Sequence, residues 1–420
     1  MIRRIFGRTG IPALALAALL ALGGEAGAFV QFPYDIDNNP ANGCGNPAGA
    51  GDVDWNGNGI IDCPPAGSNL LFKHLGASDG FATMADGSIQ YTFGFMDLTG
   101  VPDSGIMDAG DNKAEISAPT VAVKEGEQLY LTLTNVGMRL RPDLFDAHTV
   151  HFHGFPQASS IFDGEPMASL GIRMMHDLTY YYTLNDPGTY MYHCHVEATE
   201  HMEMGMLGNW IVRPADYDAG NPATWHAYNN DAGLSNYDVE AIIQYTDIAP
   251  NFHEADRTFQ SLPFAEMDIR YPLLNGRGYP DTVKTTPITT DATGLGGDIY
   301  DSQKISSLIT ATAGQRILIR LSDLSVETFI NFEIPGLPFR VVGKCARLLR
   351  NAGPDGIMGT ADDADLSYEA TTAAIAPGES MDIVIDTTGV APGTYYLYAR
   401  NLNLLNNDQM DRGGAMTEIR

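Results

Sequence analysis

Histidines and one cysteine gather in two short stretches whose spacing suits metal binding. Seven of the ten histidines lie between residues 148 and 201, and six of these seven stand within AHTVHFHG and YHCHVEATEHMEMGM. In an extended strand, alternate side chains point to opposite faces. His193 and His195 therefore share one face, while Cys194 points to the other. Two imidazoles with a thiolate and a weak thioether ligand form a blue-copper site. This spacing predicts copper chemistry around Cys194.

The parity of the first stretch predicts two separate groups of ligands. His148 has the opposite parity to the pair His151 and His153. If the two stretches pair as strands, Cys194 and His148 come together on one face. The other face then carries four imidazoles, those of His151, His153, His193 and His195. A face of four imidazoles suits one or two further copper ions.

The loop after Cys194 offers the remaining ligands of the first group. His201 supplies a second imidazole, and Met206 supplies the thioether, with Met202 and Met204 as rivals for this axial position. Zinc is the alternative metal. A free thiolate beside a methionine-rich loop favours copper.

Short strands must position these residues, and their pattern predicts an all-β protein. From about residue 114, alternating apolar segments are separated by Gly, Pro, Asn and Asp, as in an antiparallel sandwich. A second series begins near residue 237, and GTYMYHCH in the first series corresponds to GTYYLYAR in the second. We expect two β-sandwich domains, at 114–214 and 237–420, joined by a linker at 215–236. Residues 29–113, rich in Gly, Asn and Asp, are expected to form an N-terminal extension.

The N-terminus and the overall charge predict an exported protein. Residues 1–28 combine Arg3 and Arg4, a short apolar run and the small-residue segment Ala26–Ala28, which is typical of a cleaved signal peptide. No other apolar run is long enough to span a membrane. The formal net charge of −28 disfavours nucleic acid as a partner. We therefore expect a secreted protein, periplasmic or extracellular.

Two Asp-rich and Asn-rich loops are candidate calcium sites. DVDWNGNGIID places oxygen ligands at alternate positions, namely Asp52, Asp54, Asn56 and Asn58, although it lacks the terminal glutamate of a hand-like calcium loop. Residues 353–365 form a second oxygen-rich turn. Cys44 and Cys63 flank the first loop and are expected to pair as a disulfide, whereas Cys345 has no evident partner.

The His-x-x-His-x-His-Gly and His-Cys-His…His…Gly-Met stretches resemble those of multicopper oxidases. The similarity is to two-domain, laccase-like forms with the type-1 copper in the first domain, and it covers roughly residues 114–420, including LLNGRGYPDT. The resemblance implies two cupredoxin-like Greek-key domains. It implies type-1 ligands at His148, Cys194, His201 and Met206, and type-2 and type-3 ligands at His151, His153, His193 and His195.

The second domain departs from this family pattern. A complete oxygen-reducing cluster needs eight histidines in this family, four of them from a partnering domain. At the positions expected to match, this chain carries Asn331, Glu333, Tyr398 and Arg400, and no histidine follows His253. We therefore expect fewer than four coppers per chain, and either a homotrimer or a histidine-bearing partner subunit.

The resemblance implies a copper-dependent oxidoreductase that reduces O2. Electrons from a phenol, a metal ion such as Cu(I) or Mn(II), or a redox protein would pass from Cys194 to His193 and His195. We assign these three residues as catalytic. One alternative is a non-catalytic blue-copper electron carrier or copper-binding protein. A second alternative is a nitrite-reductase-like copper enzyme.

Overall fold

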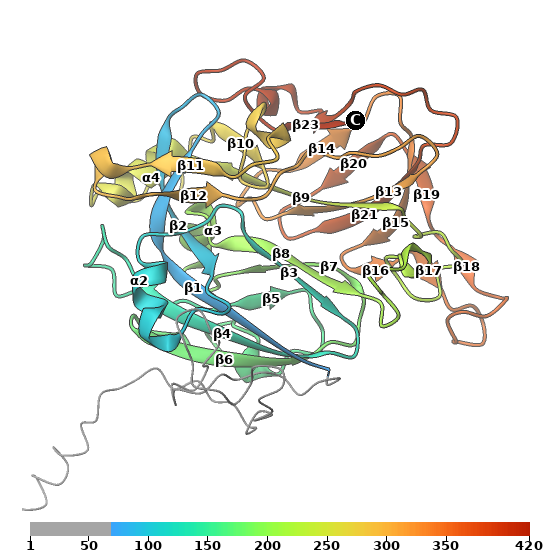
Figure 1. The fold of residues 1–420 in the computed structure, drawn as a ribbon, viewed down its shortest axis with the longest axis horizontal. Coiled ribbons are helices and arrows are strands. Elements are labelled where there is room, and N and C mark those ends of the chain that lie inside the picture. Colours follow the sequence, from blue (N-terminus) through green and yellow to red (C-terminus); the bar gives the residue numbers. More distant parts are fainter. Residues whose placement is uncertain (1–68) are drawn as a thin grey trace, which may run out of the picture.

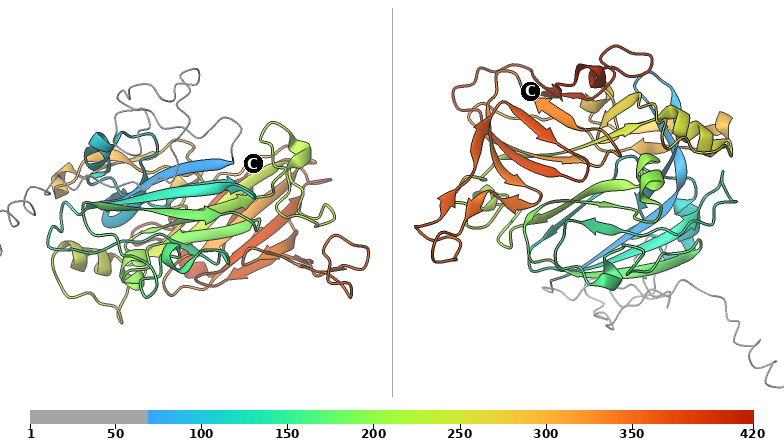
Figure 2. Two further views of the ribbon diagram at one scale, coloured as in Figure 1. Left: turned by 90° about the horizontal axis from the view of Figure 1, so that it is seen from below. Right: turned by 180° about the vertical axis from the view of Figure 1, so that it is seen from behind.

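The computed structural model describes residues 69–420, which form two β-sandwiches packed side by side (Figures 1 and 2). The expected Asx-rich loop at 52–58, the signal peptide, and Cys44 and Cys63 lie outside the described residues. Within the described range, no helix combines the length and apolar composition needed to cross a membrane.

The first sandwich has two sheets of four strands each. One sheet has the order β2-β1-β4-β6 and the other has the order β3-β8-β7-β5. The strands are β1 (Leu70–Thr83), β2 (Ile89–Asp97), β3 (Ala118–Lys124), β4 (Gln128–Gly137), β5 (His151–His153), β6 (His176–Thr183), β7 (Gly188–His193) and β8 (Leu207–Arg213). Two short helices, α2 (Ile106–Gly110) and α3 (Ala198–Glu203), lie in its connections.

Strands β1 and β2 belong to this sandwich, although residues 29–113 were expected to form a separate extension. β1 pairs in parallel with β4 along most of its length and antiparallel with β2. β1 also reaches the hairpin of β11 (Ile288–Asp291) and β12 (Ile299–Gln303), where Phe81 N donates to the Tyr300 hydroxyl at 2.9 Å (Figure 1). The first sandwich of the structure therefore begins at Leu70.

The second sandwich has one large sheet and one small sheet. The large sheet has the order β10-β9-β13-β21-β15-β16, with β19 also paired to β15, and the small sheet has the order β20-β14-β22-β23. Their strands are β9 (Val239–Ile248), β10 (Tyr271–Leu274), β13 (Arg316–Asp323), β14 (Ile330–Glu333), β15 (Phe339–Lys344), β16 (Arg347–Leu348), β19 (Tyr368–Ala370), β20 (Thr372–Ile375), β21 (Ser380–Asp386), β22 (Tyr395–Ala399) and β23 (Met416–Ile419). The short hairpin of β17 (Arg350–Asn351) and β18 (Ala364–Asp365), and helix α4 (Pro250–Arg257), complete the strands and α-helices of residues 69–420.

An aromatic stack in the first core fixes the short strand β5. The Phe152 ring lies between Trp210, at a centroid distance of 3.7 Å, and Phe155, at 4.2 Å, and both pairs are nearly parallel. All three side chains are buried. Burial of large aromatic rings is the strongest packing contribution a strand of three residues can make. Phe152 thus anchors the strand whose outer face carries His151 and His153.

A buried ionic network joins β7 to the second sandwich. Arg320 on β13 is fully buried; its Nε donates to Glu240 at 2.7 Å and its Nη1 donates to Thr189 Oγ1 at 3.0 Å. The Thr189 hydroxyl donates in turn to Asp382 at 2.5 Å. Buried charges are tolerated only when they are paired and hydrogen-bonded. The network therefore holds the strand that ends in His193 against the second sandwich.

Candidate metal centre

Strands β5 and β7 place the histidine stretches side by side. They pair antiparallel, with His151 opposite His193 and His153 opposite Met191. Cys194 and His195 follow directly after the end of β7. His148 is held by an isolated bridge to Ile172, with backbone hydrogen bonds of 2.9 and 3.0 Å. Backbone pairing thus sets the positions of both stretches.

Cys194, His148 and His201 form a buried three-ligand group. Cys194 Sγ lies 3.2 Å from His201 Nδ1 and 3.8 Å from His148 Nδ1. All three side chains are at most 1% exposed, and their ligand atoms lie within 4.8 Å of one another. The backbone N of Thr149 donates to the sulfur at 3.5 Å. A thiol and two imidazole nitrogens converging in a dry pocket are the donor set of a blue-copper site.

The loop after Cys194 folds back to close this group. Cys194 N donates to Met206 O at 3.1 Å, and Met206 N donates to His201 O at 2.8 Å. Gly205, with φ of +115°, makes the turn, and a Cβ there would lie 2.8 Å from Phe93 O. Only glycine fits such a turn without strain.

The three candidate axial methionines differ in their packing. Met204 and Met206 are fully buried in the same core cluster as Cys194. Met202 packs instead against a separate cluster of Met191, Leu207 and Leu324. Met204 and Met206 therefore have the better placement for a thioether ligand.

Four histidines gather on the opposite face. Ring centroids lie 5.0–5.7 Å apart in five of the six pairs formed by His151, His153, His193 and His195. His153 Nδ1 lies 3.1 Å from His193 Nε2. The ligand atoms of His151, His153 and His193 all lie within 4.8 Å of one another. This face can hold metal ions through imidazole nitrogens alone.

Hydrogen bonds fix two of these rings and leave one nitrogen of each ring toward the group. His151 Nδ1 donates to Asp163 O at 2.6 Å, and His193 Nδ1 donates to Cys194 O at 2.7 Å. Such bonds set the tautomer and orient Nε2 for metal binding. The second bond also connects the four-imidazole face directly to the residue that carries the thiol.

Burial keeps most of these imidazoles uncharged. It lowers the pKa of His193 to about 3 and lowers the pKa of His148, His151 and His153 below the usual histidine value. Burial also acts to lower the pKa of His201, but the charges of Cys194 and Asp146 outweigh it and raise this pKa to about 10. A neutral imidazole is the metal-binding form. A metal cation bound between Cys194 and His201 would replace the proton that His201 otherwise carries.

The chain matches the multicopper oxidase family twice, over residues 112–216 and over residues 268–419. The chain belongs to the multicopper oxidase family. It is 28% identical to a laccase of Trametes maxima over 248 residues, which are 56% of this chain and 42% of that protein. The alignment thus spans less than half of the length of this curated relative.

Solved structures share the fold of this multicopper oxidase. A blue copper oxidase from Nitrosomonas europaea superposes with a TM-score of 0.58 and 20% identity, over 84% of this chain and 85% of that chain. A copper nitrite reductase from the same organism gives a TM-score of 0.52 and 17% identity, over 83% and 93% of the two chains. These likenesses establish a cupredoxin-like architecture of two sandwiches.

In the second sandwich of this multicopper oxidase, the four residues expected at the ligand positions lie together. Tyr398 donates to Glu333 at 3.3 Å, Arg400 Nε lies 3.7 Å from Glu333, and Arg400 N donates to Asn331 O at 2.7 Å. Glu333 lies opposite Tyr398 in the ladder, so Glu333 rather than Asn331 corresponds to His151 opposite His193. The repeat alignment of this strand therefore shifts by two residues.

One residue of the second sandwich does approach the four histidines. Gly378, between β20 and β21, has φ of +82°, and a Cβ there would lie 3.3 Å from His153 Nε2. The only sequence feature that points to this contact is Gly378 itself, which follows Pro377 at a turn.

Three carboxylates near His201 were not predicted from the sequence. Asp146, Glu197 and Glu200 lie with His201 in a group whose ligand atoms are within 4.8 Å of one another. Burial raises the pKa of Glu200 to about 7. Glu197 and Glu200 lie within the second histidine stretch, and Asp146 directly precedes the first stretch. Strand parity gave no reason to select these three residues.

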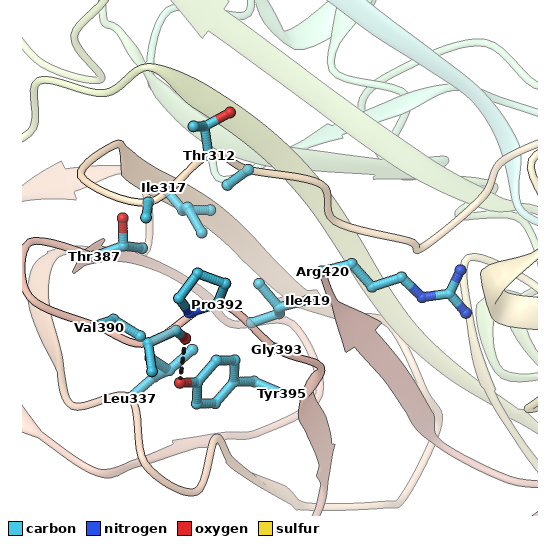
Figure 3. A pocket seen from close by; sticks show the side chains of 13 residues that line it. Thr312, Ile317, Leu337, Thr387, Val390, Pro392, Gly393, Tyr395, Ile419 and Arg420 are labelled. Carbon is cyan, nitrogen blue, oxygen red and sulfur yellow. Dashed lines mark hydrogen bonds between the residues drawn. The ribbon is translucent and has the colours of Figure 1, made fainter.

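The remaining histidines and an apolar pocket lie apart from these groups. His74 bonds Thr134, and His226 bonds Asp216. His176 bonds the backbone carbonyl of Met174, and His253 bonds two backbone carbonyls. The pocket opens in the second sandwich around Leu337, Val390 and Tyr395 (Figure 3). Its lining contains no histidine, cysteine or carboxylate side chain, so it offers no metal ligand.

Proposed function

We propose that this multicopper oxidase couples one-electron oxidation of a reductant to reduction of O2. His148, Cys194 and His201, with Met206, would hold a type-1 copper, and the four-imidazole face would hold type-2 and type-3 copper. Bound copper supplies the one-electron redox chemistry. The support is the fit of the donor sets: a buried thiol with two imidazoles on one face and four imidazoles on the other.

One observation carries this proposal, namely the short connection between the two groups. His193 Nδ1 donates to the carbonyl oxygen of Cys194 at 2.7 Å, so a single peptide segment joins the thiol to the four-imidazole face. The residues themselves hold the rings, exclude water and fix the tautomers. An electron entering near Cys194 would have a path of bonds and one hydrogen bond toward His193 and His195.

Copper analysis combined with an O2-uptake assay tests this function. With no histidine after His253, we expect one or two coppers per chain and slow O2 uptake with a phenol. Four coppers per chain in a pure homo-oligomer, with rapid O2 reduction, would contradict our interpretation of the second sandwich.

The second candidate function is a blue-copper electron carrier or copper-binding protein. This function is favoured by the residues at the expected ligand positions of the second sandwich, where Arg400 is a cation and Glu333 offers a single carboxylate. A guanidinium cannot ligate copper, and one carboxylate does not replace four imidazoles. One copper per chain with no O2 uptake would support this carrier function. Nitrite reduction is the third candidate, and the same preparation supplied with nitrite would test it.

Assembly offers a route to a complete cluster. We propose either a homotrimer, in which the four-imidazole face meets the second sandwich of another copy, or a partner subunit that brings histidines. Mass measurement of the purified protein in solution, with and without such a partner, distinguishes these assemblies.

Export and calcium binding are further proposals from the sequence. A signal peptide at 1–28 would direct the protein outside the cytoplasm, and the N-terminal residue of the mature chain tests its cleavage. Calcium at Asp52, Asp54, Asn56 and Asn58 predicts that chelation lowers the thermal midpoint. An Asp54→Ala variant should not respond to the chelator.

A further inference from the structure

A buried histidine of the second sandwich lies against the helix that carries His201. His253 belongs to α4, which connects β9 to β10, and its side chain is fully buried. Its Nε2 lies 3.0 Å from the carbonyl oxygen of Glu203, the last residue of α3. Its Nδ1 lies 2.5 Å from the carbonyl oxygen of Tyr91 on β2. One side chain from the second sandwich thus contacts both α3 and β2.

The two contacts define the protonation state of the His253 ring. A carbonyl oxygen only accepts hydrogen bonds, and a neutral imidazole has a single N–H. Because each ring nitrogen faces a carbonyl oxygen, both nitrogens must donate, and the ring is then the imidazolium cation. A neutral ring would turn a lone pair toward one of the two oxygens, which is repulsive.

Carboxylates on two helices accompany this buried cation. Glu203 Oε1 lies 3.6 Å from His253 Nε2, accepts from Ala249 N at 2.7 Å and is buried. Asp256, on the next turn of α4, is buried as well. Burial raises the pKa of Asp256 to about 6, while the charges of Arg141 and His253 act to lower it. Buried charges are tolerated when they are paired, so the imidazolium and the Glu203 carboxylate stabilise each other.

The end of α3 leads directly into the candidate copper ligands. Met204 follows Glu203, and its carbonyl oxygen accepts from Phe93 N of β2 at 2.9 Å. The Phe93 ring packs edge-on against His201 at a centroid distance of 5.9 Å. The contacts of His253 therefore hold α3 and β2 together within the ligand loop of residues 201–206.

We propose that His253 is a positioning residue, a buried imidazolium that holds the ligand loop of residues 201–206 against β2 and adds a positive charge beside it. Its effect on copper rests on the type-1 site of the proposed function. A nearby cation disfavours Cu(II) relative to Cu(I), so the charge of His253 should raise the reduction potential of that site. The hydrogen bonds of His253 themselves do not require copper.

Nitrogen NMR tests the protonation state without a functional assay. The copper-loaded protein is labelled with isotope-enriched histidine and reduced, because Cu(I) is diamagnetic. At neutral pH, both ring nitrogens of His253 should show the chemical shift of an N–H nitrogen, and their loss in His253→Gln assigns the signals. One protonated and one unprotonated nitrogen would overturn the imidazolium.

Hydrogen exchange tests the positioning role. In His253→Gln, amides of the ligand loop should exchange at least about tenfold faster, because α3 and β2 lose two charge-assisted hydrogen bonds. His74→Gln is the matched control, since it also removes a buried imidazole, but one whose ring bonds Thr134 on β4. Equal exchange rates in the wild type and His253→Gln would overturn the positioning role.

A second variant covers the case in which His253→Gln does not fold. Glu203→Gln retains an oxygen that can accept from Ala249 N and removes only the negative charge beside the ring. It should accelerate the same exchange, because the imidazolium loses its partner charge. Exchange at the wild-type rate in Glu203→Gln would then overturn the proposal.

Redox titration of the visible band tests the influence of His253 on copper. At a fixed potential, the ratio of Cu(II) to Cu(I) should rise at least about threefold in His253→Gln, because a positive charge is removed. His74→Gln should match the wild type, since burial lowers the pKa of His74 to about 4 and its ring is uncharged at neutral pH.

The outcomes separate this inference from the proposed function. An unchanged potential in His253→Gln would overturn the electrostatic effect on copper. A protein that binds no copper would overturn the proposed function and that effect together. The NMR and exchange measurements on the same chain would then still decide whether His253 is a charged positioning residue.

Discussion

The Nδ1 atom of His193 donates a hydrogen bond to the carbonyl oxygen of Cys194 at 2.7 Å. The ring therefore turns back over its own peptide segment, and its Nε2 is left for the four-imidazole face. The thiol of Cys194 points to the other side, toward His201 and His148. One strand end thus serves two ligand groups, which makes it possible to disturb them separately.

The Cys194→Ser variant should lose the intense visible absorption that a thiolate gives to copper. The hydroxyl oxygen is a poor replacement for a soft thiolate ligand, so copper content should also fall. Absorption spectroscopy and metal analysis of the purified protein measure both effects. Cys345→Ser is the control, because this exposed cysteine lies on the second sandwich and should leave colour and copper unchanged. A wild type that is colourless when copper-loaded and oxidised would refute the assignment.

The Met206→Leu variant should keep the visible colour and raise the reduction potential. The axial thioether tunes the potential, and removing it favours the reduced copper. Redox titration of the visible band measures the change. Met202→Leu is the control, since Met202 packs against Met191 and Leu324. A shift in Met204→Leu in place of Met206→Leu would assign the axial position to Met204.

The Phe152→Ala variant should lower the free energy of unfolding by about 3–5 kcal/mol, the usual cost of emptying a buried aromatic site. The cavity would lie between Trp210 and Phe155, directly under the strand that carries His151 and His153. Urea unfolding measures the loss. Phe329→Ala removes a side chain that is 71% exposed, and its effect should stay within about 0.5 kcal/mol. Equal losses in the two variants would contradict the packing argument.

His74 should make the fold less stable in acid. Burial lowers the pKa of His74 from 6.5 to about 4, although the negative charge of Asp97 acts in the opposite direction. Below pH 6.5 His74 becomes protonated in the unfolded chain but stays neutral in the folded chain. The free energy of unfolding therefore falls with pH until the pH reaches about 4. Between pH 7 and 4.5, the unfolding free energy should drop by about 2 kcal/mol more in the wild type than in His74→Gln. Parallel pH profiles for the two proteins would argue against this origin.

Strand alternation was enough to divide the ligand candidates into two groups. Side chains alternate along β5 and β7 and just beyond their ends, so local parity separates His148 and Cys194 from the four imidazoles. The all-β architecture likewise follows from alternating segments and their breaks. Whether copper occupies either group is a question for metal analysis.

Contacts between distant segments could not be predicted in this way. The parallel pairing of β1 with β4 joins residues about sixty positions apart in the chain. No turn motif in the intervening sequence predicts this pairing. Gly378 approaches His153 only because the two sandwiches pack together. The carboxylates of Glu197 and Glu200 gather through a helix of six residues, where strand parity does not apply.

The ionic network around Arg320 has a consequence for how this protein could be divided or recombined. Thr189 on β7 sits between the guanidinium of Arg320 and the carboxylate of Asp382, which both come from the second sandwich. Separating the two sandwiches would remove the Thr189 hydroxyl from both Arg320 and Asp382. It would also expose to water the side of β7 that packs against the second sandwich. Grafting the first sandwich onto another protein would therefore require a matching set of charges on the new neighbour. This network couples the two sandwiches, and the candidate ligand groups depend on a domain that supplies none of their side chains.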